Sequence, residues 1–291
     1  MIKDINVDSG TSSPALHKTH CYVQPFWEHS GIEIHNENNL DTMARMPDNH
    51  IDLTVTSPPY DTLRKYNSIF DVNVVAKELL RVTKQGGICT WVVSDKTTNG
   101  SESTTSFKQA LSFVNAGWNL HDTMIYASDK PPLNHNRYEQ EFEFMFVFSK
   151  GKPKTFNPII IECKYAGEDK SARTFRQTGD NIMETHQKTP VKSHKIKGNI
   201  WRYPTGFNKS TKDKIAFTHP AIFPEQLSAD HISTWTNEND LVYDCFSGSG
   251  TTAKMSYLQN RKCIMSEIST EYCELSKQRL LPYTSNIRLF A

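Results

Sequence analysis

Two hydrophobic patterns alternate along the chain. Short apolar runs are typical of buried strands, and apolar residues that recur every three or four positions are typical of helices. Val75, Leu79 and Val82, for example, share one face of a helix predicted at 72–83. Strands are predicted at 31–35, 51–56, 88–93, 124–126, 143–148, 241–245 and 262–267, and helices at 39–46, 72–83, 107–115, 227–235, 248–259 and 270–280.

Strands that alternate with helices predict an α/β fold with a doubly wound, mostly parallel, Rossmann-like sheet. The periodicity is lost between residues 152 and 216, where Gly, Pro, Thr and Asn recur throughout. We therefore expect an irregular insertion within the sheet domain. The expected division is an N-terminal arm at 1–25, one half of the domain at 26–157, the insertion at 158–215 and the other half at 216–291.

Charge is distributed unevenly along the 291 residues. The whole chain carries 33 Lys and Arg against 32 Asp and Glu, and its net charge of +1 indicates no particular partner. The segment from Glu162 to Lys214, however, holds twelve basic residues and six acidic ones. A basic segment on an otherwise acidic body is expected where one region contacts a polyanion such as nucleic acid. A Lys-rich solvated loop would have the same composition.

Several classes of function and site are not expected from this sequence. No apolar run approaches the roughly 18 residues of a membrane span, and the polar N-terminus lacks the core of a signal peptide, so a cytoplasmic protein is expected. The six cysteines form no Cys-x-x-Cys pair, and no metal site is expected. Glu139, Glu141 and Glu143 alternate as the polar face of a strand would. Asp95 follows the strand at 88–93, where α/β sheets place ligand contacts.

The segment Asp244–Thr252 (DCFSGSGTT) joins a strand to a helix through a glycine turn. Gly248 and Gly250 permit positive φ angles and close approach of a ligand to the backbone. Glu267 ends the next strand, where a carboxylate suits the two hydroxyls of a ribose. The glycines match neither the dinucleotide pattern nor a phosphate-binding loop. The ligand expected is therefore a nucleoside without a polyphosphate, and S-adenosylmethionine fits this description.

The segment Thr56–Tyr60 (TSPPY) follows the strand at 51–56. An exocyclic amino group of a base is a poor nucleophile because its lone pair is delocalised into the ring. Two hydrogen-bond acceptors could orient that lone pair: Ser57 Oγ and the Pro58 carbonyl. Pro58 and Pro59 stiffen the turn, and Tyr60 could stack on a base extruded from the helix. A rigid turn without a catalytic role would also account for Pro-Pro.

These two segments resemble the catalytic and cofactor motifs of DNA amino-methyltransferases, in the permuted order of the β class. Phe217–Leu227 is similar to the family segment that closes over the methionine end of the cofactor. The resemblance implies a catalytic half, then a target-recognition region, then a cofactor half. It also leaves open a homodimer and a cognate restriction endonuclease that acts on the same site. The cofactor contacts implied are Asp244, Phe246, Gly248, Gly250, Thr251, Thr252, Glu267, His219 and Pro220. At the family's acidic position after the strand at 31–35 this chain has Asn38, with Glu37 beside it.

The function expected is methyl transfer from S-adenosylmethionine to an exocyclic amino group in DNA. Ser rather than Asp before Pro-Pro-Tyr is usual in this family for cytosine N4, and adenine N6 is the alternative. An RNA or protein substrate, or a DNA-binding module without catalysis, are the other hypotheses. DNA contacts are expected in the insertion: Arg173, Arg176 and Gln177 to base edges, and Lys188, Lys192, Lys195 and Lys197 to phosphates.

Overall fold

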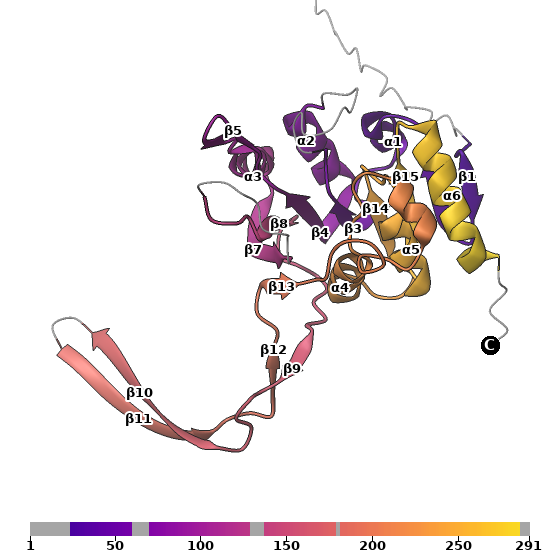
Figure 1. Cartoon of the computed structure of the whole chain (residues 1–291). Helices are drawn as coiled ribbons and strands as arrows, with labels where there is room; N and C mark the ends of the chain where they lie inside the picture. The colour runs from indigo at the N-terminus through magenta and orange to yellow at the C-terminus, as the bar shows by residue number, and fades with distance from the viewer. Residues whose placement is uncertain (1–23, 60–69, 129–136, 179–180, 286–291) are drawn as a thin grey trace, which may run out of the picture.

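The structure, a computed structural model, describes residues 24–59, 70–128, 137–178 and 181–285, with only the backbone for 169–189. Within these residues nine strands form one sheet with helices on both faces (Figure 1). In order across the sheet the strands are β1 (Trp27–His29), β2 (Ile32–His35), β15 (Lys262–Ser266), β14 (Leu241–Asp244), β3 (Ile51–Thr56), β4 (Thr83–Val93), β8 (Phe142–Ser149), β7 (Asn119–Ala127) and β13 (Ile200–Arg202).

The centre of the sheet is parallel. Strands β2, β15, β14, β3 and β4 all run in one direction. β8 pairs antiparallel with β4 and with β7, and β13 pairs parallel with β7. The doubly wound, mostly parallel sheet predicted from the sequence is confirmed. Parallel central strands bury both faces, which explains why β3 is buried at every position except Asp52 although its sequence alternates between apolar and polar residues.

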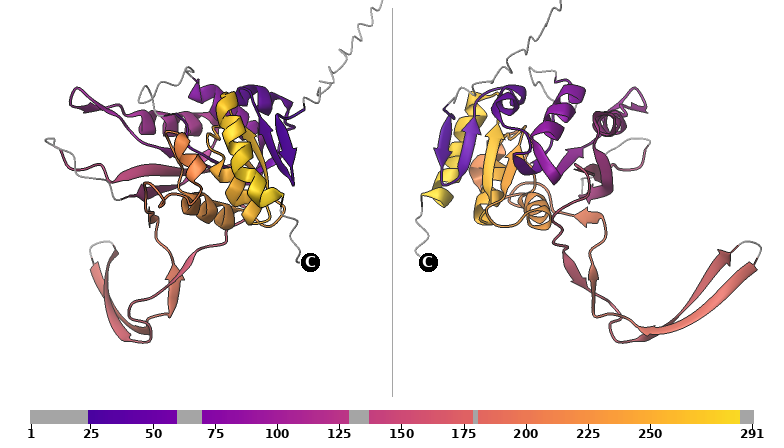
Figure 2. Two further views of the ribbon diagram at one scale, coloured as in Figure 1. Left: turned by 45° about the vertical axis from the view of Figure 1, so that its right-hand side comes forward. Right: turned by 180° about the vertical axis from the view of Figure 1, so that it is seen from behind.

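Each face of the sheet has its own core. Leu79 and Phe113 belong to the core on one face, and Leu227 and Leu280 to the core on the other, and all four side chains are fully buried. Burial of one such side chain contributes about 2 kcal/mol. The helices of the first face are α1 (Asn39–Arg45), α2 (Val72–Val82) and α3 (Thr105–Ala116), and those of the second are α4 (Glu225–Trp235), α5 (Thr251–Leu258) and α6 (Thr270–Thr284) (Figures 1 and 2).

The insertion is more regular than predicted. Strands β10 (Asp169–Thr178) and β11 (Asn181–Pro190) pair antiparallel over ten residues, and nearer the domain β9 (Ile160–Glu162) pairs with β12 (His194–Ile196). The resulting arm extends away from the sheet domain (Figures 1 and 2). The expectation of an irregular segment was wrong because these strands are polar at most positions and lack the alternation that marks a half-buried strand.

The insertion is also shorter than the predicted range 158–215. β13 lies within the main sheet, and Trp201 on this strand is buried against the His231 ring, with ring centroids 4.9 Å apart. From Tyr203 onward the chain returns along the domain and leads into α4. The projecting part is therefore the arm at about 159–199, and residues 200–215 belong to the domain. Among the described residues no helix is long and apolar enough to cross a membrane.

Candidate active site

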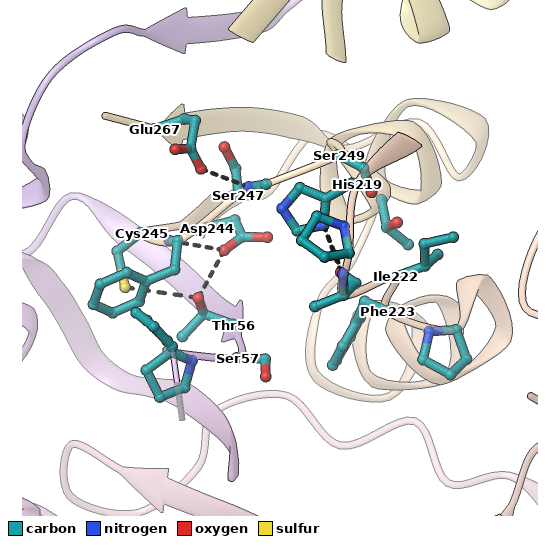
Figure 3. Close-up of a pocket in the computed structure, with 18 of the residues that line it drawn as sticks. Thr56, Ser57, His219, Ile222, Phe223, Asp244, Cys245, Ser247, Ser249 and Glu267 are labelled. Atoms are coloured by element: carbon teal, nitrogen blue, oxygen red, sulfur yellow. Dashed lines mark hydrogen bonds between the residues drawn. The ribbon is translucent and has the colours of Figure 1, made fainter. Parts of the chain in front are cut away.

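A cavity of about 710 Å³ opens where parallel strands of the sheet end. Thr56, Asp244 and Ser266, at the carboxyl ends of β3, β14 and β15, all line it. Crevices at the carboxyl ends of parallel strands are where α/β sheets bind ligands. The two segments singled out in the sequence, one from each half of the chain, are thus brought to one site (Figure 3). Of the predicted residues the lining includes Ser57, Pro58, Pro59, Asp244, Phe246, Gly248, Thr251, Glu267, His219 and Pro220.

Asp244 joins the two segments. Its Oδ1 accepts a hydrogen bond from Thr56 Oγ1 at 2.7 Å and another from the Phe246 amide at 3.1 Å (Figure 3). Thr252, at the start of α5, donates from Oγ1 to the Val55 carbonyl at 3.3 Å. Burial raises the pKa of Asp244, and its hydrogen bonds oppose this effect. These contacts fix the end of β3 against the glycine turn.

Glu267 holds the glycine turn from the neighbouring strand. Its Oε2 accepts from the Gly248 amide at 2.9 Å, and its Oε1 accepts from the Ser269 amide at 2.9 Å. Burial raises the pKa of Glu267, and the backbone hydrogen bonds act against that increase. Each carboxylate oxygen can accept a second hydrogen bond. The carboxylate can therefore shape the turn and still receive the hydroxyls of a nucleoside.

At both glycines of the turn, a neighbouring side chain occupies the space that a Cβ atom would need. Gly248 has a φ of +50°, and a Cβ there would lie 2.9 Å from the His219 imidazole. Gly250 has a φ of +74°, and its Cβ would lie 2.9 Å from Ser276 Oγ. The sequence predicts that both glycines admit the ligand. In the structure the missing side chain of Gly248 leaves room for the His219 imidazole, which borders the cavity. The missing side chain of Gly250 leaves room for α6, and Gly250 is not among the lining residues.

His219 and the apolar residues after it form the opposite side of the cavity. The imidazole Nδ1 lies 2.8 Å from the Ala221 carbonyl oxygen and 3.1 Å from the Ala221 amide nitrogen, and the ring meets Tyr272 edge-on with centroids 4.4 Å apart. Ile222 and Phe223 border the same open space (Figure 3). An apolar surface opposite the Glu267 carboxylate suits a ligand with a flat ring and a polar sugar.

Ser57, the residue after β3, lines the cavity. Figure 3 shows its hydroxyl turned away from Asp244 and toward the space that Phe223 borders. Pro58 and Pro59 continue the lining. Tyr60 lies outside the described residues, so its stacking role stays a prediction.

Three polar residues beyond Ser57 were missed as site residues. Tyr126 and Glu143 are paired across β7 and β8, and both line the cavity together with Ser128. Tyr126 is 5% exposed, and burial, followed by the charge of Glu143, raises the pKa of its hydroxyl. The interpretation of Glu143 as part of a polar strand face overlooked the β7–β8 pairing, which brings it to the cavity.

Other acidic candidates have structural partners. The Asp95 carboxylate accepts from the Ser106 amide at 3.1 Å and from Ser103 Oγ at 3.1 Å, so it fixes the start of α3, and it is not among the lining residues. Glu37 lines the cavity but binds Arg45 and Thr42. Asn38 also lines it and caps α1 through the Leu40 amide at 2.9 Å. Within the described ranges no group of three or more His, Cys, Asp or Glu could hold a metal ion.

The residues predicted to contact DNA lie on the arm. Lys192 and Lys195 are exposed, as a phosphate contact requires. Lys197 differs, because its Nζ lies 4.8 Å from the Trp201 ring centroid and 3.8 Å from Asp230 Oδ2 at the base of the arm. The remaining four residues, described by their backbone only, lie in β10 and β11: Arg173, Arg176, Gln177 and Lys188.

Comparisons with known proteins agree with this geometry. A family model described as DNA methylase matches residues 51–278. The orphan methyltransferase M.BamHII of Bacillus amyloliquefaciens is 53% identical over 238 residues, which cover 80% of this chain and 89% of the relative. The structure resembles the PvuII DNA methyltransferase (cytosine-N4-specific), with a TM-score of 0.68, 21% identity and coverage of 91% and 90%. It also resembles M1.HpyAVI in its SAM complex, with a TM-score of 0.54, 21% identity and coverage of 86% and 100%.

Proposed function

The chain belongs to the DNA methylase family whose model spans residues 51–278, and from this premise we propose that it methylates the exocyclic N4 of cytosine in DNA with S-adenosylmethionine as methyl donor. The observation that carries the proposal is the joining of two motifs in one cavity. Ser57–Pro59 and the glycine turn both line it, and the Thr56–Asp244 hydrogen bond of 2.7 Å links their strands. A methyl donor and an amino acceptor can thus meet at the ends of β3 and β14.

The cofactor would occupy the side of the cavity formed by the glycine turn, Glu267 and His219. The Gly248 amide is already bonded to Glu267 rather than open to a phosphate, and the Glu267 carboxylate can accept further hydrogen bonds from ribose hydroxyls. The complex of M1.HpyAVI with SAM supports this assignment, since the two folds are alike. Bound there, S-adenosylmethionine supplies an electrophilic methyl group on a sulfonium.

The target base would enter beside Ser57. Ser57 Oγ and the Pro58 carbonyl accept the two hydrogens of the amino group, and this directs its lone pair toward the methyl group. Tyr60 stacks on the extruded base. Bound S-adenosylmethionine would supply the methyl group for direct in-line transfer to the amino nitrogen, with its sulfur leaving as a thioether. The methylated nitrogen is then cationic and releases a proton.

Two features favour cytosine over adenine. Ser57 precedes Pro58-Pro59-Tyr60, where the resemblance associates Ser with cytosine. The structural neighbour from the PvuII system is cytosine-N4-specific by name. Target recognition is assigned to the arm, which is basic and extends away from the sheet domain (Figure 2). The domain halves at 26–157 and 216–291 would then supply the base site and the cofactor site.

Genomic DNA from cells that express the protein, sequenced with detection of modified bases, tests the proposal. We expect N4-methylcytosine at one recurrent sequence. N6-methyladenine there would show that adenine, the alternative, is the target base. Ser57→Ala should lose about 2–4 kcal/mol of transition-state stabilisation in single-turnover assays without weaker cofactor binding. Ser112→Ala, which removes a hydroxyl bonded to the Lys108 carbonyl on α3, is the matched control. Full single-turnover activity in Ser57→Ala would refute the orienting role.

A further inference from the structure

Four charged side chains meet beneath the glycine turn, outside the groups that line the cavity. Arg279 on α6 and Lys254 on α5 face Asp213 and Glu225, and their side chains are 0%, 5%, 13% and 19% exposed, respectively. Each cation contacts both anions at 2.6–2.8 Å. The cluster is electrically balanced, as a buried group of charges must be to persist.

Arg279 uses its whole guanidinium. Nε donates to Asp213 Oδ2 at 2.8 Å, and Nη2 donates to Glu225 Oε1 at 2.6 Å and to Thr211 Oγ1 at 3.3 Å. Nη1 donates to the Ser249 carbonyl at 2.8 Å and to Thr251 Oγ1 at 2.9 Å. The five N–H groups of an arginine side chain point outward from one rigid, planar guanidinium. Arg279 therefore sets the relative positions of all the groups that it binds.

Apart from Glu225, the first residue of α4, these groups belong to two segments on either side of the proposed cofactor position. Ser249 and Thr251 are part of the glycine turn and line the cavity. Thr211 and Asp213 belong to residues 203–224, here called the wall segment, which runs from β13 to α4 and has one 3-10 turn (η2, Lys214–Thr218) as its regular structure. The wall segment also lines the cavity, at Thr205, Gly206, Phe207, Ser210, Phe217 and His219–Pro224.

The chemistry of the cluster indicates that it positions the two segments rather than that it adds to the stability of the fold. Apolar side chains of similar volume commonly stabilise a fold as well as a buried ion cluster does. Burial acts to raise the pKa of Asp213, but hydrogen bonds from Arg279, Lys254 and Tyr283 lower it to about 2. The carboxylate thus stays ionised, and the wall segment stays bound to the turn, throughout the pH range of the cell.

We propose that Arg279 is a positioning residue for the cofactor: it fixes the width of the cavity between the glycine turn and the wall segment. Its guanidinium holds the Ser249 carbonyl from one side and Asp213 from the other. The glycine turn with Glu267 and the wall segment with His219 are then held at one separation before the cofactor enters. A cavity organised in advance loses less conformational entropy on binding. This inference rests on the proposed cofactor site.

Calorimetry with S-adenosylmethionine tests it. Arg279→Lys keeps the charge, but one ammonium cannot reach both segments. We expect a Kd about tenfold higher or more, which corresponds to 1.4 kcal/mol, with single-turnover rates at saturating cofactor within about threefold of wild type. Arg261→Lys is the matched control, since Arg261 binds Thr236 and Gln259 away from the cavity. An Arg279→Lys protein that folds and binds the cofactor as wild type does would overturn the inference.

A milder variant covers the case in which Arg279→Lys fails to fold. Thr211→Val keeps the shape of the side chain but removes its bonds to Arg279, to Glu225 and to the Asp213 amide, and it leaves the glycine turn untouched. It should weaken cofactor binding several-fold while the thermal midpoint changes little. A lower midpoint with unchanged affinity would show a purely structural cluster. If the wild-type protein itself binds no S-adenosylmethionine, the proposed function fails instead, so the two failures are distinct.

Discussion

The cofactor side of the cavity and the arm differ in what holds them in place. Around the glycine turn, Asp244, Glu267 and Arg279 form hydrogen bonds to groups far apart in the sequence. β10 and β11 are paired with each other over ten residues, and the arm stands clear of the domain (Figure 1). An isolated two-stranded hairpin is marginally stable in water. The site of chemistry is thus organised by the fold, whereas the arm can be organised further by its ligand.

This contrast places the two functions on separate parts. Methyl transfer requires reacting atoms held within a narrow range of distances and angles. Sequence recognition requires a surface that reaches into a groove, and the major groove of DNA admits a two-stranded ribbon. A variant of one part should therefore leave the other function unchanged.

Two glycines with positive φ give the sharpest comparison, with the largest expected effect. Gly248→Ala places a Cβ 2.9 Å from the His219 ring, whereas Gly167→Ala, in the arm, meets nothing within 4 Å. Both variants impose about 1–2 kcal/mol of left-handed strain. We expect Gly248→Ala to abolish measurable cofactor binding by calorimetry, and Gly167→Ala to retain it. Equal affinities in the two variants would mean that the turn is not where the cofactor binds.

Removal of the arm tests the separation directly. The Cys163 amide donates to the Ser193 carbonyl at 2.8 Å, so the chain can be rejoined there through an Asn-Gly turn. The protein without residues 164–192 should bind S-adenosylmethionine within about twofold of wild type, since no cavity residue is lost. Methylation of genomic DNA should disappear. Methylation that persists at the same sequence would place recognition in the domain.

Local motifs could be predicted from the sequence, and long-range pairings could not. The glycine turn and Ser57–Pro59 are recognisable because each is a strand end followed by residues of unusual backbone chemistry. Glu143 was misread because only the antiparallel pairing of β8 with β7 brings it to the cavity. The cluster of Arg279 joins four sequence-distant segments, and no spacing indicates it. β10 and β11 were missed because strands that pair only with each other need no hydrophobic alternation.

His231 gives the domain a pH dependence that the arm should not share. The imidazole is fully buried between Thr90, Met145 and Trp201, and burial, then the charge of Lys197, lowers its pKa to about 3. Between pH 6.5 and about 3 the unfolded chain binds this proton and the folded one does not. The free energy of unfolding therefore decreases as the pH is lowered through that window, by up to about 1.4 kcal/mol per pH unit.

Denaturant titrations at several pH values check this prediction. Between pH 6 and 4 the free energy of unfolding of His231→Gln should depend less steeply on pH than that of wild type. The difference in slope should correspond to at most one bound proton. The same substitution at His194, which is exposed on β12, is the control and should leave the slope unchanged. A slope that His231→Gln does not alter would mean that other groups account for acid sensitivity.

The smallest expected effects separate the residues of the arm from one another. In the β10–β11 register, Arg173 is opposite His186, Gln177 opposite Ile182 and Arg176 opposite Met183. Directly opposed residues share a face, and neighbours along a strand alternate. Positions 173, 177 and 188 therefore lie on one face of the ribbon and position 176 lies on the other. One face of a ribbon in the major groove meets the bases, so only one of the two arginines should read a base.

Binding assays with sets of single-base variants of the recognition sequence decide which arginine does so. Arg173→Ala or Arg176→Ala, but not both, should lose about 1–3 kcal/mol at one base position and relax specificity there. Lys192→Gln and Lys195→Gln, at exposed positions, should instead weaken binding to every duplex equally and lower the salt dependence by about one unit of slope. Identical, sequence-independent losses in all four variants would show that the arm supplies charge alone. The determinants of sequence would then have to lie among the groups that line the cavity.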